Sequence, residues 1–285
     1  MTNDIRAVVF DWAGTMVDFG SRAPIGAFAQ AFAERGVDLH EHEILADMGR
    51  AKREHIVRLL ERPEVAERWR MCTGSRWTSL DVDQLMIRLE PLMRSSIEMH
   101  GQLIPGACES VEALRSAGTK IGSTTGYTQA MMPPLLRTAA DQGYVPDAVF
   151  CSDDAPLGRP APFLIWKALL SLERWPIRQC VVVDDTCTGV EAGRAAGAWT
   201  VGCAISGALV GLTQSDWEAL DGGEKSRRFY AARAALEASG ADFVIETVAQ
   251  LPAAIAEIRN RLLDGGMPGL PPADLIVTDK SQSDN

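Results

Sequence analysis

The sequence predicts an α/β fold in which a parallel sheet carries helices on both faces and a helical cap domain is inserted into the core. Three strand-like runs, at 7–10, 120–125 and 181–185, each lead into carboxylate or hydroxyl side chains. Helical stretches lie between them, and this alternation is typical of a parallel sheet covered on both faces. We therefore expect a Rossmann-like core formed by residues 1–20 and 100–265.

The first strand-like run, at 7–10, ends at Asp11 and is followed by Trp12-Ala13-Gly14-Thr15. A short strand that ends in Asp before a Gly turn places a potential nucleophile at the carboxyl edge of a sheet, where α/β proteins carry out their chemistry. The alternative is an Asp that only caps the following helix. Asp11 alone does not decide between the two.

The cap domain is expected over residues 21–99, because helical periodicity dominates 25–35, 41–61, 63–70 and 80–100. Few strand-like runs interrupt this part of the chain. A segment of this length between the first two core strands is large enough to cover a site at the edge of the sheet.

The predicted helix at 41–61 carries a candidate amine. Met48, Lys52, His55 and Ile56 share one face at spacings of three and four residues. Partial desolvation beside Met and Ile lowers the pKa of an ammonium, as do nearby positive charges, here those of Arg50 and Arg53, and a neutral amine can attack a carbonyl. The alternative is a solvated lysine on a charged helix face.

The second run, at 120–124, breaks into Thr125, Gly126 and Tyr127. Backbone amides and a hydroxyl at such a turn can hold phosphoryl oxygens, because Gly permits close approach and a hydroxyl donates without bulk. The alternative is an ordinary Ser/Thr turn that caps a helix at about 129–134.

A further strand-like run at 148–151 is followed by a loop that contains Gly158-Arg159-Pro160. The guanidinium of Arg159 could pair with phosphoryl oxygens in a fork. The alternative is a surface arginine in a proline-rich turn.

The run at 181–183 ends in Asp184 and Asp185, ahead of a helical stretch at 189–196. Hard cations such as Mg²⁺ prefer oxygen ligands and take one or two carboxylates, which Asp11 and Asp185 could supply. The alternative is a pair of acids that cap a helix start.

The rest of the chain predicts strands at 198–205 and 242–245 and helices at 231–238 and 248–263. The end, at 266–285, is mostly Gly, Pro and polar residues, and we expect a flexible tail.

Taken in this order, the four core motifs resemble those of the haloacid dehalogenase superfamily. Met48-Gly49 with Lys52 and His55 narrows the resemblance to the phosphonoacetaldehyde hydrolase (phosphonatase) family, and it runs from about residue 5 to about residue 263. It implies that Asp11 is the nucleophile and that Lys52 forms a Schiff base. It also implies Mg²⁺ held by Asp11, the backbone carbonyl of Ala13 and Asp185.

The resemblance further implies hydrolysis of the carbon–phosphorus bond of phosphonoacetaldehyde to acetaldehyde and phosphate, and a homodimer formed through the cap. Phosphatases of the superfamily carry a second Asp two residues after the nucleophile, where this chain has Ala13. An iminium on Lys52 makes that acid unnecessary, because it accepts the electrons of the broken bond as an enamine. His55 is the candidate for proton transfer, and Met48 and Tyr127 are expected to line the pocket.

Two departures from the family pattern leave questions open. Ser21 stands where some members have Cys, which keeps hydrogen bonding but not thiol acidity. Other members carry Gly-Asp with a further Asp downstream, whereas this chain has Asp184-Asp185 and then Gly189, so a contact between Asp184 and the metal stays open. A phosphatase or dehalogenase on the same scaffold, which would not need Lys52, and a noncatalytic phosphonate-binding protein are the alternatives.

Composition limits the partners. The 285 residues are 46% hydrophobic, and 38 acidic against 28 basic residues give a net charge of −10 with no basic tract, which disfavours nucleic acid as a partner. The six Cys show no metal-ligand spacing with the four His. Because we find no signal peptide and no apolar span of transmembrane length, we expect reduced thiols in a cytoplasmic protein without membrane contact.

Overall fold

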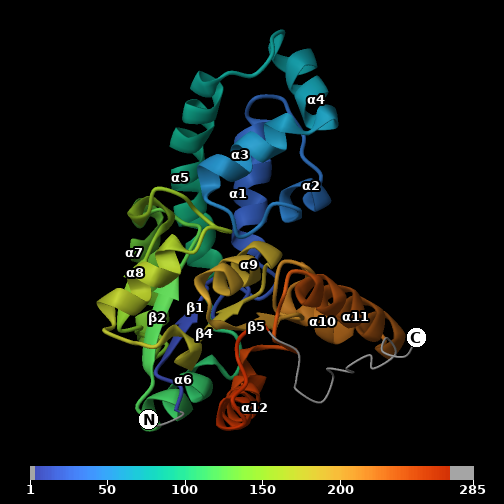
Figure 1. Cartoon of the computed structure of the whole chain (residues 1–285). Coiled ribbons are helices and arrows are strands. Elements are labelled where there is room, and N and C mark those ends of the chain that lie inside the picture. The colour runs from blue at the N-terminus through green and yellow to red at the C-terminus, as the bar shows by residue number, and fades with distance from the viewer. Residues whose placement is uncertain (1–3, 270–285) are drawn as a thin grey trace, which may run out of the picture.

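The structure is a computed structural model, and it describes residues 4–269. Its centre is a six-stranded sheet in the order β3-β2-β1-β4-β5-β6, with every neighbouring pair parallel (Figure 1). The strands are β1 (Ala7–Phe10), β2 (Lys120–Thr124), β3 (Ala148–Phe150), β4 (Cys180–Asp184), β5 (Trp199–Cys203) and β6 (Phe243–Ile245).

The helices of the described residues divide between the faces of this sheet and a group beyond its edge. They are α1 (Arg22–Ala33), α2 (Glu41–Leu45), α3 (Lys52–Glu61), α4 (Pro63–Thr73), α5 (Ser79–His100), α6 (Ala107–Ser116), α7 (Met132–Asp141), α8 (Phe163–Ser171), α9 (Cys187–Ala196), α10 (Gln214–Ala219), α11 (Gly222–Ala238) and α12 (Leu251–Leu263). Short 3-10 turns are η1 (Gln129–Met131), η2 (Ser152–Asp154), η3 (Ile177–Gln179) and η4 (Val248–Gln250).

The central strands β1 and β4 are buried along their whole length. Continuous apolar runs of this kind suit strands that are covered on both faces. Ala7 and Val9 pack on one side with α8 and α9, whereas Val8 and Phe10 belong to the larger apolar cluster that includes α6 and α12. The predicted fold class, a parallel sheet with helices on both faces, is confirmed.

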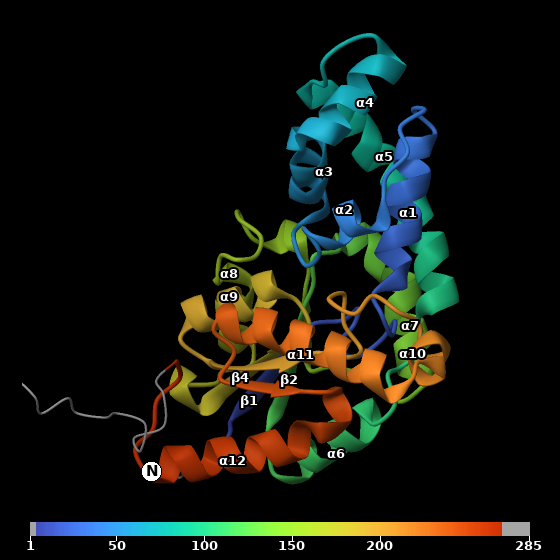
Figure 2. The same cartoon turned by 90° about the vertical axis from the view of Figure 1, so that its right-hand side faces the viewer.

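Helices α1 to α5 stand beyond the carboxyl edge of the sheet (Figures 1 and 2). Their inner side chains, among them Phe28, Leu59 and Trp69, belong to the same apolar cluster as Phe10 of β1. This arrangement puts a helical layer over the strand ends where the candidate site lies. The domain boundaries at 20/21 and 99/100 stay a prediction.

The single helix predicted over 41–61 is wrong. The chain forms two helices there, α2 and α3, separated by a loop in which Gly49 has the left-handed φ of 88°. Met48 lies in this loop, so it does not share a helix face with Lys52, which is the first residue of α3.

Four other helices extend beyond the predicted pattern or fall outside it. α6, α8 and α10 were not predicted, and α11 starts at Gly222 rather than at 231. The early turns of α11 have no apolar stripe, and ion pairs of Glu224 with Arg227 and Arg228 hold them instead. A search for apolar periodicity cannot find such a segment.

Most of the predicted flexible tail, 270–285, lies outside the described residues. The four residues before it, 266–269, are described, and the Gly269 amide donates a hydrogen bond of 2.7 Å to Asp242 Oδ1. Within residues 4–269, no helix has the length and hydropathy needed to cross a membrane.

Candidate active site

Asp11 lies directly after β1, in the middle of the sheet. Its amide donates to the Val183 carbonyl at 2.9 Å, which extends the pairing of β1 with β4 by one residue. The backbone of Asp11 is therefore fixed at the carboxyl edge, and its side chain is buried. The sheet thus presents one carboxylate at a defined position.

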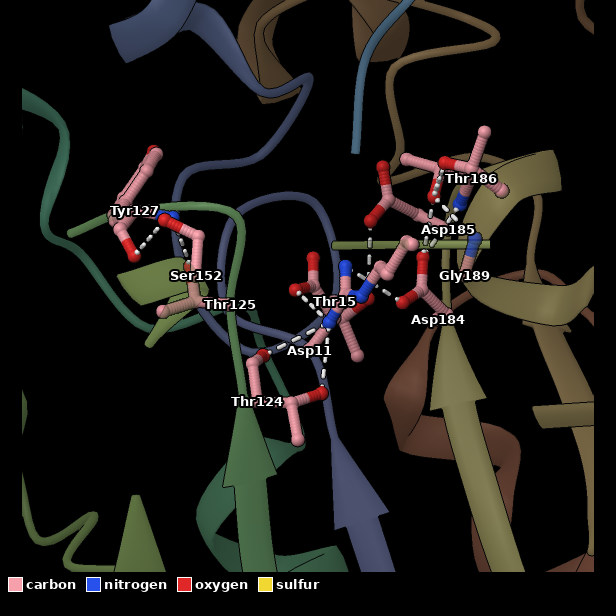
Figure 3. Close-up of polar contacts among 12 residues, drawn as sticks. Asp11, Thr15, Thr124, Thr125, Tyr127, Ser152, Asp184, Asp185, Thr186 and Gly189 are labelled. Carbon is pink, nitrogen blue, oxygen red and sulfur yellow. Dashed lines mark hydrogen bonds and ion pairs between the residues drawn. The ribbon is translucent and has the colours of Figure 1, made fainter. Parts of the chain in front are cut away.

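Two more carboxylates join Asp11 from the end of β4. One oxygen from each of Asp11, Asp184 and Asp185 lies within 4.8 Å of the others. Figure 3 shows these side chains gathered above the ends of β1 and β4. The sequence-based expectation that Asp11 and Asp185 come together is therefore met by the geometry.

Arg159 is buried among these acids. Its Nη2 lies 2.8 Å from Asp11 Oδ1 and its Nη1 lies 3.0 Å from Asp184 Oδ2, and only 3% of the residue is exposed. Nη2 also donates to the carbonyl and the hydroxyl of Thr124, both at 2.9 Å. The surface-arginine alternative is wrong, because the guanidinium holds the nucleophile candidate in place.

The carboxylates outnumber the one arginine. Burial, and then the charges of Asp11 and Asp184, raises the pKa of Asp185 well above its usual range. Burial also raises the pKa of Asp184 to about 6, although Arg159 opposes the shift. Excess buried negative charge on oxygen ligands fits a hard divalent cation, so the residues present suit a metal centre.

Hydrogen bonds fix the orientation of Asp185. Its Oδ1 accepts from the Thr15 hydroxyl at 3.1 Å, and its Oδ2 accepts from the Ala208 amide at 2.9 Å and the Ser21 hydroxyl at 3.3 Å. A Cβ on Gly14, which has a φ of 80°, would lie 2.3 Å from Asp185 Oδ2. Only glycine leaves room for the carboxylate there.

Hydrogen bonds of Thr125 stabilise the turn after β2. The Thr125 amide donates to the Phe150 carbonyl at 3.0 Å, and the Thr125 hydroxyl accepts from the Tyr127 amide at 3.1 Å (Figure 3). The residue here that contacts Arg159 is Thr124, the last residue of β2, which the sequence analysis did not single out. Phosphoryl binding by Thr125 and Gly126 stays a prediction.

Lys52 is buried on the cap side, with 3% of the residue exposed. Its Nζ lies 5.0 Å from the ring centroid of Tyr127 and 5.6 Å from that of Phe28. Burial, helped by the positive charge of Arg159, lowers the pKa of Lys52 to about 8, against the opposing charges of Asp11 and Asp18. An appreciable neutral fraction at working pH is thereby available.

The expected source of positive charge around Lys52 needs a correction. Arg50 forms ion pairs with Asp47 and Glu54, and Arg53 pairs with Asp83. These carboxylates offset both guanidinium charges. The positive charge that acts on Lys52 is that of Arg159, which comes from the core.

His55 lies three residues after Lys52 on α3 and is fully buried. Its ring centroid is 4.2 Å from that of Phe28. Burial, together with the charge of Lys52, holds the pKa of His55 well below its usual range. The expectation that this imidazole titrates near working pH is therefore wrong, and His55 is neutral there.

Tyr127 and Met48 are both buried near the cap–core contact. Burial, with the charges of Asp18, Asp11 and Asp185 acting in the same direction, raises the pKa of Tyr127 well above its usual range. The phenol is therefore neutral, and its ring face is what Lys52 meets. Pocket-lining roles for both residues stay a prediction.

Known proteins are similar to this chain over nearly its whole length. A family model described as haloacid dehalogenase-like hydrolase matches residues 5–197. The phosphonoacetaldehyde hydrolase of Syntrophobacter fumaroxidans is 40% identical over 267 residues, which cover 94% of this chain and 96% of that protein. The phosphonoacetaldehyde hydrolase of Hahella chejuensis is 42% identical over 264 residues, which cover 93% and 90%. The chain belongs to the phosphonoacetaldehyde hydrolase family.

Solved structures agree. A phosphonoacetaldehyde hydrolase-like protein from Oleispira antarctica has a TM-score of 0.92 at 38% identity, covering 93% of this chain and 96% of that one. A β-phosphoglucomutase from Clostridium difficile, at 16% identity and a TM-score of 0.66, shares the fold. The superfamily and the family suggested by the motifs are both confirmed.

The geometry explains why this chain has Asp184 and Gly189 where other members of the phosphonoacetaldehyde hydrolase family have a glycine and a downstream aspartate. A Cβ on Gly189 would lie 1.9 Å from the Asp184 carboxyl carbon. Asp184 Oδ1 accepts from the amide and hydroxyl of Thr186, at 2.9 and 2.7 Å (Figure 3). The carboxylate of Asp184 thus fills the space that a side chain at position 189 would take. A contact between Asp184 and a metal stays open.

The sequence analysis did not identify Asp18 as a residue near the candidate site. Its carboxylate accepts from the Arg22 and Ala23 amides, each at 2.9 Å, and so caps α1. Burial raises its pKa to about 7, and its charge acts on Lys52. An acid four residues before a helix start is a signal that could have drawn attention to it.

Proposed function

We propose that this protein hydrolyses the carbon–phosphorus bond of phosphonoacetaldehyde and releases acetaldehyde and phosphate. The observation that carries the proposal is the buried Lys52, whose pKa of about 8 responds to Asp11 and Arg159 of the carboxylate centre. An amine and a carboxylate close enough for the charge of one to shift the pKa of the other can act on one small substrate. Relatives about 40% identical to this chain bear the name of this activity.

The two groups answer two separate problems of the reaction. Expulsion of a bare carbanion from phosphorus is prohibitive. The neutral Lys52 amine attacks the aldehyde carbon, water leaves, and the resulting iminium can accept an electron pair. An oxygen of Asp11 then attacks phosphorus, and the electrons of the broken carbon–phosphorus bond form an enamine on Lys52.

Two hydrolyses complete the cycle. Protonation of the enamine carbon returns an iminium, and water releases acetaldehyde and the free amine. A second water hydrolyses the aspartyl phosphate on Asp11. Because the enamine leaves without a proton on oxygen, Ala13 suffices where a phosphatase needs an acid.

The metal in this proposal is Mg²⁺, held by Asp11, the Ala13 carbonyl and Asp185. When bound, it supplies positive charge to the carboxylate and phosphoryl oxygens. Arg159 orients Asp11 through its contact of 2.8 Å and offers guanidinium charge to the phosphonate. Ser21 orients Asp185 through its hydroxyl.

The substrate sits between the turn after β2 and the cap. The Gly126 amide and the Thr125 hydroxyl donate to phosphonate oxygens, and Tyr127 and Met48 bound the aldehyde side. Neutral His55 accepts and returns protons in the carbinolamine steps at Lys52. Support for this role is its place three residues after Lys52 on α3, which is close enough for the charge of Lys52 to act on the imidazole.

The experiment incubates the protein with phosphonoacetaldehyde and Mg²⁺ and measures acetaldehyde and phosphate in equal amounts. Borohydride added with the substrate is expected to trap an adduct on the peptide that contains Lys52. Lys52→Arg keeps the charge but has no neutral amine to react, so adduct and turnover should both disappear. An unmodified Lys52 peptide beside full turnover would refute the imine mechanism.

Other outcomes would favour the alternatives. Phosphate release from ordinary phosphate esters without a Lys52 adduct would indicate a phosphatase on this scaffold. Tight phosphonate binding without products would indicate a binding protein.

A homodimer through the cap belongs to the same proposal. The exposed apolar residues Met71, Leu80 and Ile87 support it, and light scattering tests it. A cytoplasmic location stays a prediction.

A further inference from the structure

The loop between α2 and α3, residues 48–51, is in tight contact with the core. A Cβ on Gly49 would lie 2.4 Å from Thr186 Oγ1 and 2.6 Å from Thr188 Oγ1. A Cβ on Gly126 would lie 2.5 Å from the Arg50 carbonyl oxygen. Since Lys52 follows this loop directly, the position of the loop on the core determines the position of the Lys52 amine.

A third core segment closes around the same loop. A Cβ on Gly158, the residue before Arg159, would lie 3.0 Å from the Ala51 Cβ. The loop therefore meets the start of α9, the turn after β2 and the segment that delivers Arg159. Each contact involves a glycine, whose backbone approaches a hydroxyl at Gly49, a backbone carbonyl at Gly126 and a methyl group at Gly158.

One hydrogen bond joins this loop to the core within residues 4–269. The Thr188 hydroxyl, in the first turn of α9, donates to the Met48 carbonyl at 3.1 Å. The Thr186 hydroxyl oxygen lies 3.3 Å from that of Thr188 and itself donates to Asp184 at 2.7 Å. The Thr188 proton therefore has two possible acceptors, Met48 when the loop is seated and Thr186 when it is not.

This pair of acceptors gives the Thr188 hydroxyl a partner both when the loop is seated and when it is released. A buried hydroxyl that lost its only partner would cost free energy, whereas Thr188 exchanges one acceptor for the other. The contacts continue from Thr186 through Asp184 and Arg159 to Asp11. The loop that precedes Lys52 is thus joined to the network that orients the nucleophile candidate.

We propose that Thr188 is a positioning residue that docks the 48–51 loop on the core and thereby places Lys52 over Asp11. It does not touch the reacting atoms. The part that concerns Lys52 as the reacting amine rests on the proposed function, whereas the docking itself does not.

The test compares Thr188→Val, which keeps the shape and removes the hydroxyl, with Thr188→Ser, which keeps the hydroxyl. Hydrogen exchange of the amides at 48–51, measured on the full chain without substrate, is expected to quicken about fivefold in Thr188→Val, because the carbonyl of Met48 then lacks its hydrogen-bond donor in the seated loop. Thr188→Ser should exchange as the wild type does. Unfolding midpoints show whether both variants are folded. If Thr188→Val does not fold, Thr188→Ala replaces it as the variant without the hydroxyl.

A second readout follows the amine. Borohydride trapping with phosphonoacetaldehyde, measured against pH, should show a midpoint raised above that of the wild type in Thr188→Val, because a loosened loop lets water reach Lys52. Thr188→Ser should restore the midpoint, which a general loss of stability would not explain. Wild-type exchange at 48–51 in Thr188→Val would overturn the proposal. Quickened exchange without any trapping in the wild type would uphold docking and refute the Lys52 chemistry.

Discussion

The carboxylate centre of the core (Asp11, Asp184 and Asp185) and the lysine pocket of the cap (around Lys52) are both buried, yet their charged groups have different neighbours. In the core, Asp11, Asp184 and Asp185 share the charge of Arg159 and hydrogen bonds from fixed donors. In the cap, Lys52 meets aromatic faces, and no ion pair holds it in the described part of the chain.

The same physical cause therefore acts with opposite sign on the two regions. Burial raises the pKa of the core acids Asp184 and Asp185 and lowers that of Lys52. The core becomes a site that demands positive charge, and the cap becomes a site that offers a neutral amine. In the proposed mechanism the cleavage of the carbon–phosphorus bond needs both regions, and the comparison can be tested by altering one region and measuring the function of the other.

The largest effect is expected from Asp11→Asn, which removes the carboxylate proposed as the nucleophile and keeps the shape of the side chain. Phosphate release should fall by about 10³-fold or more, since an essential group is lost. Trapping on Lys52 should survive. Because Asp11 raises the pKa of Lys52, the trapping midpoint should also move to lower pH. Phosphate assays and mass spectrometry of the trapped peptide measure both.

The control is the wild type trapped under the same conditions. If Asp11→Asn kept its phosphate release, Asp11 would not be the nucleophile. If it lost trapping as well while remaining folded, the two regions would not be separable in the way the comparison requires.

A smaller effect is expected where the core is most tightly packed. Gly189→Ala places a methyl group 1.9 Å from the carboxyl carbon of Asp184, so we expect a loss of about 2 kcal/mol in the free energy of unfolding. Denaturant titration measures it. Gly26→Ala is the matched control in α1, where no atom lies within 4 Å of an added Cβ, and it should stabilise by about 0.5 kcal/mol.

A double variant sharpens this prediction. Asp184→Gly with Gly189→Asp moves the carboxylate to the other backbone position while keeping it in the same space. We expect the pair to retain more phosphate release than either single change, as contacting residues couple. Equal additive losses would mean that position 189 cannot supply this carboxylate.

The two regions also differ in how far the sequence could predict them. The strand ends at Asp11 and Asp185 follow from local apolar runs, and the sheet brought them together as expected. Lys52 was singled out although the helix assumed for it was wrong, and the apolar groups beside its amine are the rings of Phe28 and Tyr127, which come from other segments. Local patterns thus located the carboxylates at the strand ends, whereas the family resemblance singled out Lys52.

What the sequence could not provide were contacts between distant segments. Arg159 meets Asp11 only through the fold, and Thr188 meets Met48 across 140 residues. The neutral state of His55 likewise depends on burial by helices that the pattern could not place in space. Such features depend on tertiary packing, to which a local pattern is blind.

The smallest effect is expected in the cap pocket. Trapping should rise about tenfold per pH unit below about pH 8 and level off above it, because the attacking amine must be neutral and the pKa of Lys52 is lowered to about 8. Tyr127→Leu removes a ring face that stabilises the charged form, worth about 0.5–1 kcal/mol. The midpoint should therefore fall by about half a unit.

Tyr127→Phe is the matched control, since it keeps the ring 5.0 Å from Nζ and loses only a neutral hydroxyl. Its midpoint should stay at the wild-type value. A wild-type midpoint near 10.5, the ordinary value for lysine, would mean that Lys52 is solvated when it reacts. In that case aromatic burial in the cap would not be what prepares the amine, and the contrast with the charge-balanced core would no longer explain the reaction.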